Sequence, residues 1–264
     1  MKELTKINDN FYRLITPYVD IFTSVYFIKT EEGVLIFDTA SGEGDVDSYI
    51  LPAMKEIGIS LEDVKYIFIS HNHKDHARGL KRLMEIMPRA TIVSRSDKLQ
   101  EDFADYSFIA PDDSTVIMSC LKVVTITGHT LDCSAIYDMR TKTLITGDCL
   151  QLYGIYGSGD WGCNVNFIPE HFEAVEKVRL LDIETVYTAH DYHPLGYKLV
   201  GKKQINEALD YCKKPLFEIK DIIENNPQLD DAEVRLAYNA SANLPTVNVK
   251  VVEAMRKAIV EGKI

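Results

Sequence analysis

The sequence predicts an α/β (α+β) protein with mixed β-sheets, and three observations lead to this class. Short β-rich runs alternate with amphipathic helical windows up to about residue 195. Two of these runs, 134–138 and 143–148, are close enough to form an antiparallel hairpin. Beyond about residue 200 only helical spacing remains. Hairpins combined with strand–helix units are typical of mixed sheets with helices packed on them.

Each element follows from its own pattern. Runs rich in Val, Ile, Phe and Tyr and bounded by turn residues predict strands over 23–29, 34–38, 65–70, 121–127, 134–138 and 143–148. Apolar residues at helical spacing predict helices over 45–57, 76–87 and 170–181. In the second window, Leu80, Leu83, Met84 and Met87 form one apolar stripe, which Pro88 ends.

The change in character near Pro194 predicts two parts. Strand signals disappear there, and three successive helical patterns follow. We therefore expect a main domain over 1–199 and a helical extension over 200–264, packed on the main domain.

Composition limits the function. The 264 residues include 46% hydrophobic residues, which is enough for a sizeable core and excludes disorder as the dominant state. A net charge of −11 makes nucleic acid and anionic membrane surfaces poor partners. The five cysteines form no C-x-x-C pair, and neither a signal peptide nor an apolar run long enough to span a bilayer is recognisable. These features predict a cytoplasmic protein.

Four metal-capable side chains lie within six residues of SHNHKDHARGL, namely His71, His73, Asp75 and His76. They follow the strand predicted over 65–70, at the edge of a sheet where ligand-binding groups commonly gather. In an extended turn His71 and His73 would point to the same side, whereas Asp75 and His76 would open the next helix and could serve a second ion. A solvated turn with Asp75 as a helix cap would explain one histidine, but three histidines with a carboxylate favour a metal site.

Three further candidate ligands each come at the end of a β-rich run: His129 in TITGHT, Asp148 in LITGDC and His190 in VYTAHD. Together the seven residues provide imidazoles and carboxylates without a thiolate. This donor set suits two divalent ions, with zinc as the first expectation and iron or manganese as alternatives.

The combined motif resembles that of the metallo-β-lactamase-fold hydrolases. The H-x-H-x-D-H, G-H-T, T-G-D and late H-D segments occur here in the family's order, at 71–76, 128–130, 146–148 and 190–191. The resemblance implies an αββα sandwich of two mixed sheets flanked by helices. It also implies that one ion is held by His71, His73 and His129, the other by Asp75, His76 and His190, with Asp148 bridging them. Asp38, in VLIFDTA, would orient a ligand loop or act as a structural cap.

The expected activity is hydrolysis of a small-molecule ester, thioester or lactone. Two ions can share a hydroxide whose pKa falls to about 7, and Asp75 or Asp148 can accept a proton. Lactonases and glyoxalase-II-like enzymes provide the analogy, although the glutathione-binding pattern of the latter is not recognisable. The alternatives are an iron-dependent persulfide dioxygenase-like oxidoreductase, a compact nuclease and a non-catalytic metal-binding protein.

The substrate pocket is expected near the glycine-rich segment 150–169, which leaves directly from Asp148. Tyr153, Tyr156 and Trp161 could form an adjustable wall, with Trp161 as a simple core residue in the alternative reading. The residues Tyr192 and His193, which follow His190, could also line the pocket. His171 is interpreted as a surface or capping histidine, and a homodimer is expected by analogy with similar enzymes.

Overall fold

In a computed structural model of the chain, residues 3–156, 161–241 and 247–264 are described. The chain divides into two compact units. The first comprises Met1–Val124 and Ile136–Met139, and the second comprises Thr125–Ala135 and Arg140–Ile264. The predicted domains, residues 1–199 and 200–264, do not correspond to these two units. The units do not test that division, which stays a prediction.

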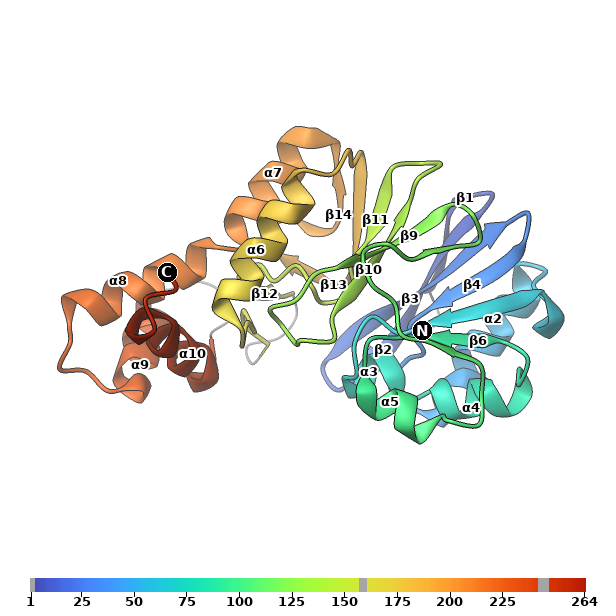
Figure 1. Cartoon of the computed structure of the whole chain (residues 1–264), viewed down its shortest axis with the longest axis horizontal. Helices are drawn as coiled ribbons and strands as arrows, with labels where there is room; N and C mark the ends of the chain where they lie inside the picture. The colour runs from blue at the N-terminus through green and yellow to red at the C-terminus, as the bar shows by residue number, and fades with distance from the viewer. Residues whose placement is uncertain (1–2, 157–160, 242–246) are drawn as a thin grey trace. The chain divides into compact units, whose positions relative to one another are not determined.

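The first unit is built on a seven-stranded mixed sheet (Figure 1) with the order β1-β2-β3-β4-β5-β6-β7. Its first four strands pair antiparallel and the pairs from β4 to β7 are parallel. The strands are β1 (Glu3–Asn8), β2 (Phe11–Tyr18), β3 (Ile21–Thr30), β4 (Gly33–Phe37), β5 (Val64–Phe68), β6 (Thr91–Val93) and β7 (Phe108–Ile109).

Helices of this unit cover one face of the sheet. Val25, Phe27 and Ile67 from the strands share one buried cluster with Leu80 and Leu83 of the predicted stripe. Alternation along the strands turns Tyr26, Phe37 and Phe68 to the opposite face, where their rings stack or meet edge to face. The helical segments are α1 (Glu43–Asp45), the π-helical η1 (Val46–Ile50), α2 (Leu51–Glu56), the 3₁₀ turn η2 (Leu61–Asp63), α3 (Lys74–Ala77), α4 (Leu80–Ile86) and α5 (Asp97–Asp102).

The second sheet has the order β12-β13-β11-β10-β9-β8, with β14 also paired to β13. It is mixed as well, because β11 and β13 are parallel whereas β12 and β14 run antiparallel to β13. The strands are β8 (Val116–Ile117), β9 (Leu121–Thr125), β10 (Ser134–Asp138), β11 (Thr143–Ile145), β12 (Gly154–Ile155), β13 (Thr185–His193) and β14 (Gly196–Val200). The predicted class of two mixed sheets with flanking helices is therefore confirmed.

The second unit ends in helices, as predicted. In Figure 1, α8, α9 and α10 gather around one another near the C-terminus, and they share a buried apolar cluster that includes Leu216, Val234 and Met255. The helix α7 packs on β13 and β14, and α6 packs on α7. The helices are α6 (Ile168–Arg179), α7 (Gly201–Tyr211), α8 (Lys214–Asn225), α9 (Asp231–Ser241) and α10 (Val249–Val260). None of the helices described is both long and apolar enough to cross a membrane.

The sequence analysis missed the strands at both ends of the predicted series. β1 and β2 precede the first predicted run; β1 has polar, largely exposed side chains, and β2 contains Arg13 and Pro17, so neither shows a clear strand pattern. Strand structure also continues past Pro194, because β14 pairs with β13 despite carrying Gly196 and the exposed Lys198. These strands are stabilised by backbone pairing with their neighbours, which side-chain patterns do not reveal.

Candidate metal centre

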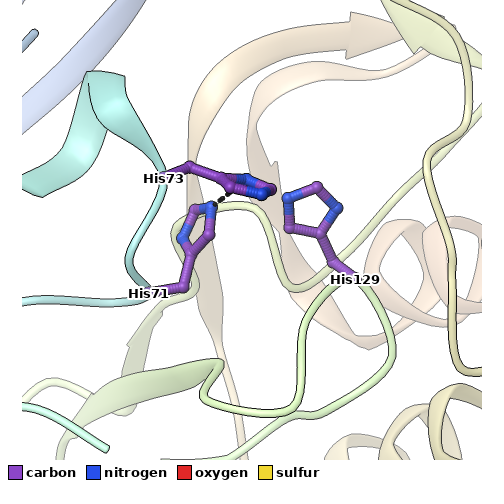
Figure 2. Close-up of side chains that lie close together, drawn as sticks. All are labelled: His71, His73 and His129. Carbon is purple, nitrogen blue, oxygen red and sulfur yellow. Dashed lines mark hydrogen bonds between the residues drawn. The ribbon is translucent and has the colours of Figure 1, made fainter. Parts of the chain in front are cut away.

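The H-x-H-x-D-H segment occupies the turn that follows β5 and the first turn of α3. His73 has an extended backbone and stands at the N-cap, so the helix begins at Lys74 and carries Asp75 and His76 in its first turn. The Nε2 atom of His71 lies 2.9 Å from Nδ1 of His73 (Figure 2), so these two nitrogens face a common point. This geometry agrees with the expectation that the side chains of His71 and His73 point to the same side of the turn.

Asp75 and His76 form a second pair in the same unit. One carboxylate oxygen of Asp75 lies 3.2 Å from Nε2 of His76 and accepts a 2.8 Å hydrogen bond from the Thr23 hydroxyl on β3. The Nδ1 atom of His76 lies 2.7 Å from a carboxylate oxygen of Asp38. An Nδ1–H donated to Asp38 leaves Nε2 as the lone-pair nitrogen that a metal ion requires.

Asp38 contacts both His76 and the turn that precedes it. It is fully buried and has a φ of 62°, a left-handed conformation that Asp tolerates better than most residues. The backbone N–H and the hydroxyl of Ser70 both donate to its carboxylate, at 2.8 and 2.9 Å. Burial raises the pKa of Asp38, while the interactions with His76 and Ser70 act in the opposite direction. These contacts are compatible with the loop-orienting role that the resemblance implied for Asp38, and that role stays a prediction.

The remaining three candidate ligands come together in the second unit. Nε2 of His190 lies 3.1 Å from one carboxylate oxygen of Asp148, and Nε2 of His129 lies 3.7 Å from the other. The Nδ1–H of His129 donates to the backbone carbonyl of Asn164 at 2.6 Å, which again leaves Nε2 for a metal. All three side chains are almost completely buried.

His190 lies inside β13, which extends to His193. The sequence analysis had placed it at the end of a strand. The pairing of β13 with β14 shifts register between Tyr187 and Tyr192, so His190 belongs to an irregular stretch of the strand. Thr188 supports this stretch by donating a 2.7 Å hydrogen bond to the His190 carbonyl. Irregularities of this kind redirect side chains, and they are frequent next to functional sites.

His129 also depends on a close approach of the chain. Gly128 has a φ of +136°, and a Cβ there would lie 2.5 Å from Cβ of His171 on α6. His171 is not the surface residue that the sequence suggested. It is fully buried, its Nε2–H donates to the Cys212 carbonyl, and its Nδ1 has no hydrogen-bond partner among the described residues. The contact between His171 and Gly128 arises from the packing of α6, which the sequence does not show.

The residues expected to line a pocket divide into separate groups. The hydroxyl of Tyr192 donates to Asp148 at 3.1 Å, so Tyr192 supports a candidate ligand. The ring centroids of Tyr156 and His193 are 3.5 Å apart. Tyr153 instead packs against Tyr211, and its burial raises the pKa of its hydroxyl. Trp161 is half-buried, and its carbonyl accepts a hydrogen bond from Ile155 of β12.

The segment 150–169 is partly anchored. Its residues Gly154 and Ile155 form β12, which pairs with His193 and Tyr192 of β13, whereas residues 157–160 lie outside the described part of the chain. Sequence reasoning missed several supporting residues, namely Thr23, Ser70, Gln151 and Asn164. Of these only Ser70 had a sequence signal, since it directly precedes His71.

The donor set suits divalent metal ions. Within each unit, imidazole nitrogens converge with carboxylate oxygens, and three of the histidines have their second nitrogen within hydrogen-bond distance of a carboxylate, hydroxyl or carbonyl oxygen. Such contacts set the tautomer and ring orientation of metal-binding histidines. Nitrogen and oxygen donors without thiolates are compatible with zinc, iron and manganese.

Comparison with known proteins gives the same family. The Metallo-beta-lactamase superfamily matches residues 18–190. A Beta-lactamase-like protein 2 homolog of Caenorhabditis elegans is 23% identical over 89% of this chain and 78% of its own length. A hydroxyacylglutathione hydrolase of Francisella philomiragia is 32% identical over 63% of this chain, a match that spans 65% of that relative, just under two thirds.

Solved structures agree at the level of the fold. A metallo-beta-lactamase family protein from Thermus thermophilus superposes with a TM-score of 0.70 at 16% identity, covering 97% of this chain and 95% of that one. The fold, the order of the motifs and the family match to 173 of the 264 residues lead to one conclusion. The chain belongs to the metallo-β-lactamase superfamily of metal-dependent hydrolases.

Proposed function

We propose that the protein hydrolyses a small-molecule ester, thioester or lactone with the help of two divalent metal ions. Each ion would have three histidine or aspartate ligands of its own, and Asp148 would be shared between them. The first set is His71, His73 and His129, and the second is Asp75, His76 and His190.

The geometry of Asp148 is the observation that carries this proposal. Its two carboxylate oxygens face different histidines, His190 at 3.1 Å and His129 at 3.7 Å, as a carboxylate shared by two ions would require. Inside the first unit Asp75 lies 3.2 Å from His76, and inside the second unit His129 and His190 flank Asp148. Seven candidate ligands exceed what one tetrahedral ion can use, which favours two ions over one.

The chemistry follows from this donor set. When bound, two divalent ions lower the pKa of water toward about 7 and polarise a carbonyl oxygen. The protein contributes orientation: Asp38 fixes His76, Asn164 fixes His129 and Thr23 fixes the carboxylate of Asp75. Asp75 or Asp148 would accept the proton that the attacking water releases.

The relatives support the substrate class. Several are hydroxyacylglutathione hydrolases, which favours a substrate with an acyl group for this chain also. Zinc is the metal that we propose first, with iron second, because the ligands are imidazoles and carboxylates. A cytoplasmic location and a homodimer are proposed from the sequence, and fractionation and light scattering would test them.

Elemental analysis combined with a substrate panel tests the function. Protein purified without added metal should carry two ions per chain and should turn over at least one ester, thioester or lactone. One ion with oxygen consumption on a persulfide would select the dioxygenase alternative, and cleavage of RNA alone would select a nuclease. Bound metal without turnover on any of these would favour a non-catalytic metal-binding protein.

A further inference from the structure

Gln151 is a buried amide that no sequence motif marks. It stands three residues after Asp148, and only 2% of its surface is exposed. A primary amide offers a donor end and an acceptor end in one plane, so a buried glutamine is stable only where both ends find partners. Both ends of Gln151 do.

The donor end contacts Asp148 and its partner. The Nε2 atom of Gln151 donates to the Asp148 carbonyl at 2.9 Å and, more weakly, to the hydroxyl oxygen of Tyr192 at 3.4 Å. Because the Tyr192 oxygen accepts from Gln151, its own proton is directed to the carboxylate of Asp148, 3.1 Å away. The amide therefore contacts Asp148 twice, once through its backbone and once through Tyr192.

The acceptor end reaches the segment that orients His129. The Oε1 atom of Gln151 accepts a 3.1 Å hydrogen bond from the backbone N–H of Asn164. The carbonyl of the same residue accepts the Nδ1–H of His129 at 2.6 Å. The backbone N–H of Asn164 thus bonds to Gln151, and its backbone carbonyl bonds to His129.

We infer that Gln151 is a positioning residue that holds Asp148 and His129 in register for metal binding. The inference rests on the proposed metal-dependent function and adds a residue that acts through two ligands without touching the ions. His129 and Asp148 are 19 residues apart and lie on separate loops. The buried amide connects the two loops and fixes the Asp148 carboxylate relative to the His129 imidazole. Both side chains would then bind an ion without a change in loop conformation.

Cobalt binding by three variants tests this inference, with Co²⁺ as the probe because it absorbs visible light. Gln151→Met keeps the volume but removes both ends of the amide, and Tyr192→Phe removes only the hydroxyl. We expect the dissociation constant for Co²⁺, measured by competition with a chelating dye, to rise about 10- to 100-fold in Gln151→Met. It should rise less in Tyr192→Phe, and the double variant should resemble Gln151→Met because the contacts form one chain.

The visible spectrum of bound Co²⁺ separates positioning from general stability. Thr143→Val is the matched control, because it removes a buried hydroxyl on β11, outside the motif, that bonds to Thr141. Gln151→Met should shift the cobalt spectrum, whereas Thr143→Val should leave it unchanged. The stability of both metal-free variants in urea reports the structural cost separately.

The outcomes are distinct. If Gln151→Met binds Co²⁺ with wild-type affinity and spectrum, the inference is overturned while the proposed function stands. If the wild-type chain binds no Co²⁺, the proposed function itself fails, and the inference fails with it. Should Gln151→Met not fold, Gln151→Glu takes its place, because a carboxylate keeps an acceptor for the Asn164 N–H but cannot donate to the Asp148 carbonyl when ionised. Wild-type affinity and spectrum in that variant would overturn the inference.

Discussion

The two ligand clusters of this protein are constructed in different ways. In the first unit, four candidate ligands come from one six-residue segment, and they contact Asp38, directly after β4, and Thr23 on β3. In the second unit, His129, Asp148 and His190 come from three segments more than 15 residues apart, and loop residues hold them together. A compact motif needs only its local backbone conformation, whereas a dispersed one depends on tertiary hydrogen bonds.

The largest expected effect concerns the carboxylate at the centre of the dispersed cluster. Asp148→Asn keeps the shape of the side chain and removes the charge proposed to be shared by two ions, so kcat should fall about 1000-fold. Asp182→Asn is the control, because that exposed carboxylate pairs with Lys142 at the surface. A kcat within tenfold of wild type in Asp148→Asn would refute the bridging role.

The dispersed cluster should also be sensitive to acid through His171. Burial lowers the pKa of His171 to about 4 in the folded protein, whereas an unfolded histidine titrates near 6.5. The folded state therefore favours the neutral ring. Its contribution is complete above about pH 6.5 and is lost as the pH falls to 4, by about 3 kcal/mol in total.

Urea unfolding of the metal-free protein at pH 7 and pH 4 measures this contribution. The free energy of unfolding should drop more for wild type than for His171→Gln, which cannot titrate but can still donate to the Cys212 carbonyl. Equal losses in the two proteins would show that His171 is not the source of the acid sensitivity.

In the compact cluster, Asp38→Asn probes the contact that His76 receives from outside the turn. Asn tolerates the left-handed backbone at φ 62°, so the fold should persist while His76 loses its charged acceptor. We expect metal affinity to fall about 10- to 100-fold in chelator competition. Asp63→Asn, in an exposed turn with Ser60, should bind metal normally. Equal affinity in both variants would mean that the turn orients His76 unaided.

The smallest effect is expected at Trp161, on the segment after Asp148. If its half-buried ring forms part of a substrate wall, Trp161→Ala should change KM by up to about tenfold, or about 1.4 kcal/mol, and leave the metal content unchanged. Steady-state kinetics on two substrates of different size would show the change in selectivity. A loss of about 3–5 kcal/mol in unfolding free energy would instead identify a core residue.

Sequence alone indicated most of the candidate site, because the patterns involved lie within short segments of the chain. Strand ends, short spacings and residue chemistry indicated the seven candidate ligands, and the family resemblance implied a role for Asp38, because the family motif consists of contiguous segments. Metal binding by these residues stays a prediction. The mixed α/β class followed from the alternation of runs. These properties depend on near neighbours in the chain, which the sequence displays directly.

Only the tertiary structure decided which residues hold the ligands. Thr23, Gln151 and Asn164 have no distinguishing pattern, and His171 was assigned to the surface because its helix packing against Gly128 is a contact between residues 43 positions apart. The same holds for β14, which is a strand because β13 is available to pair with it. Such contacts arise from packing and backbone pairing between distant segments, and periodicity along one chain carries no record of them.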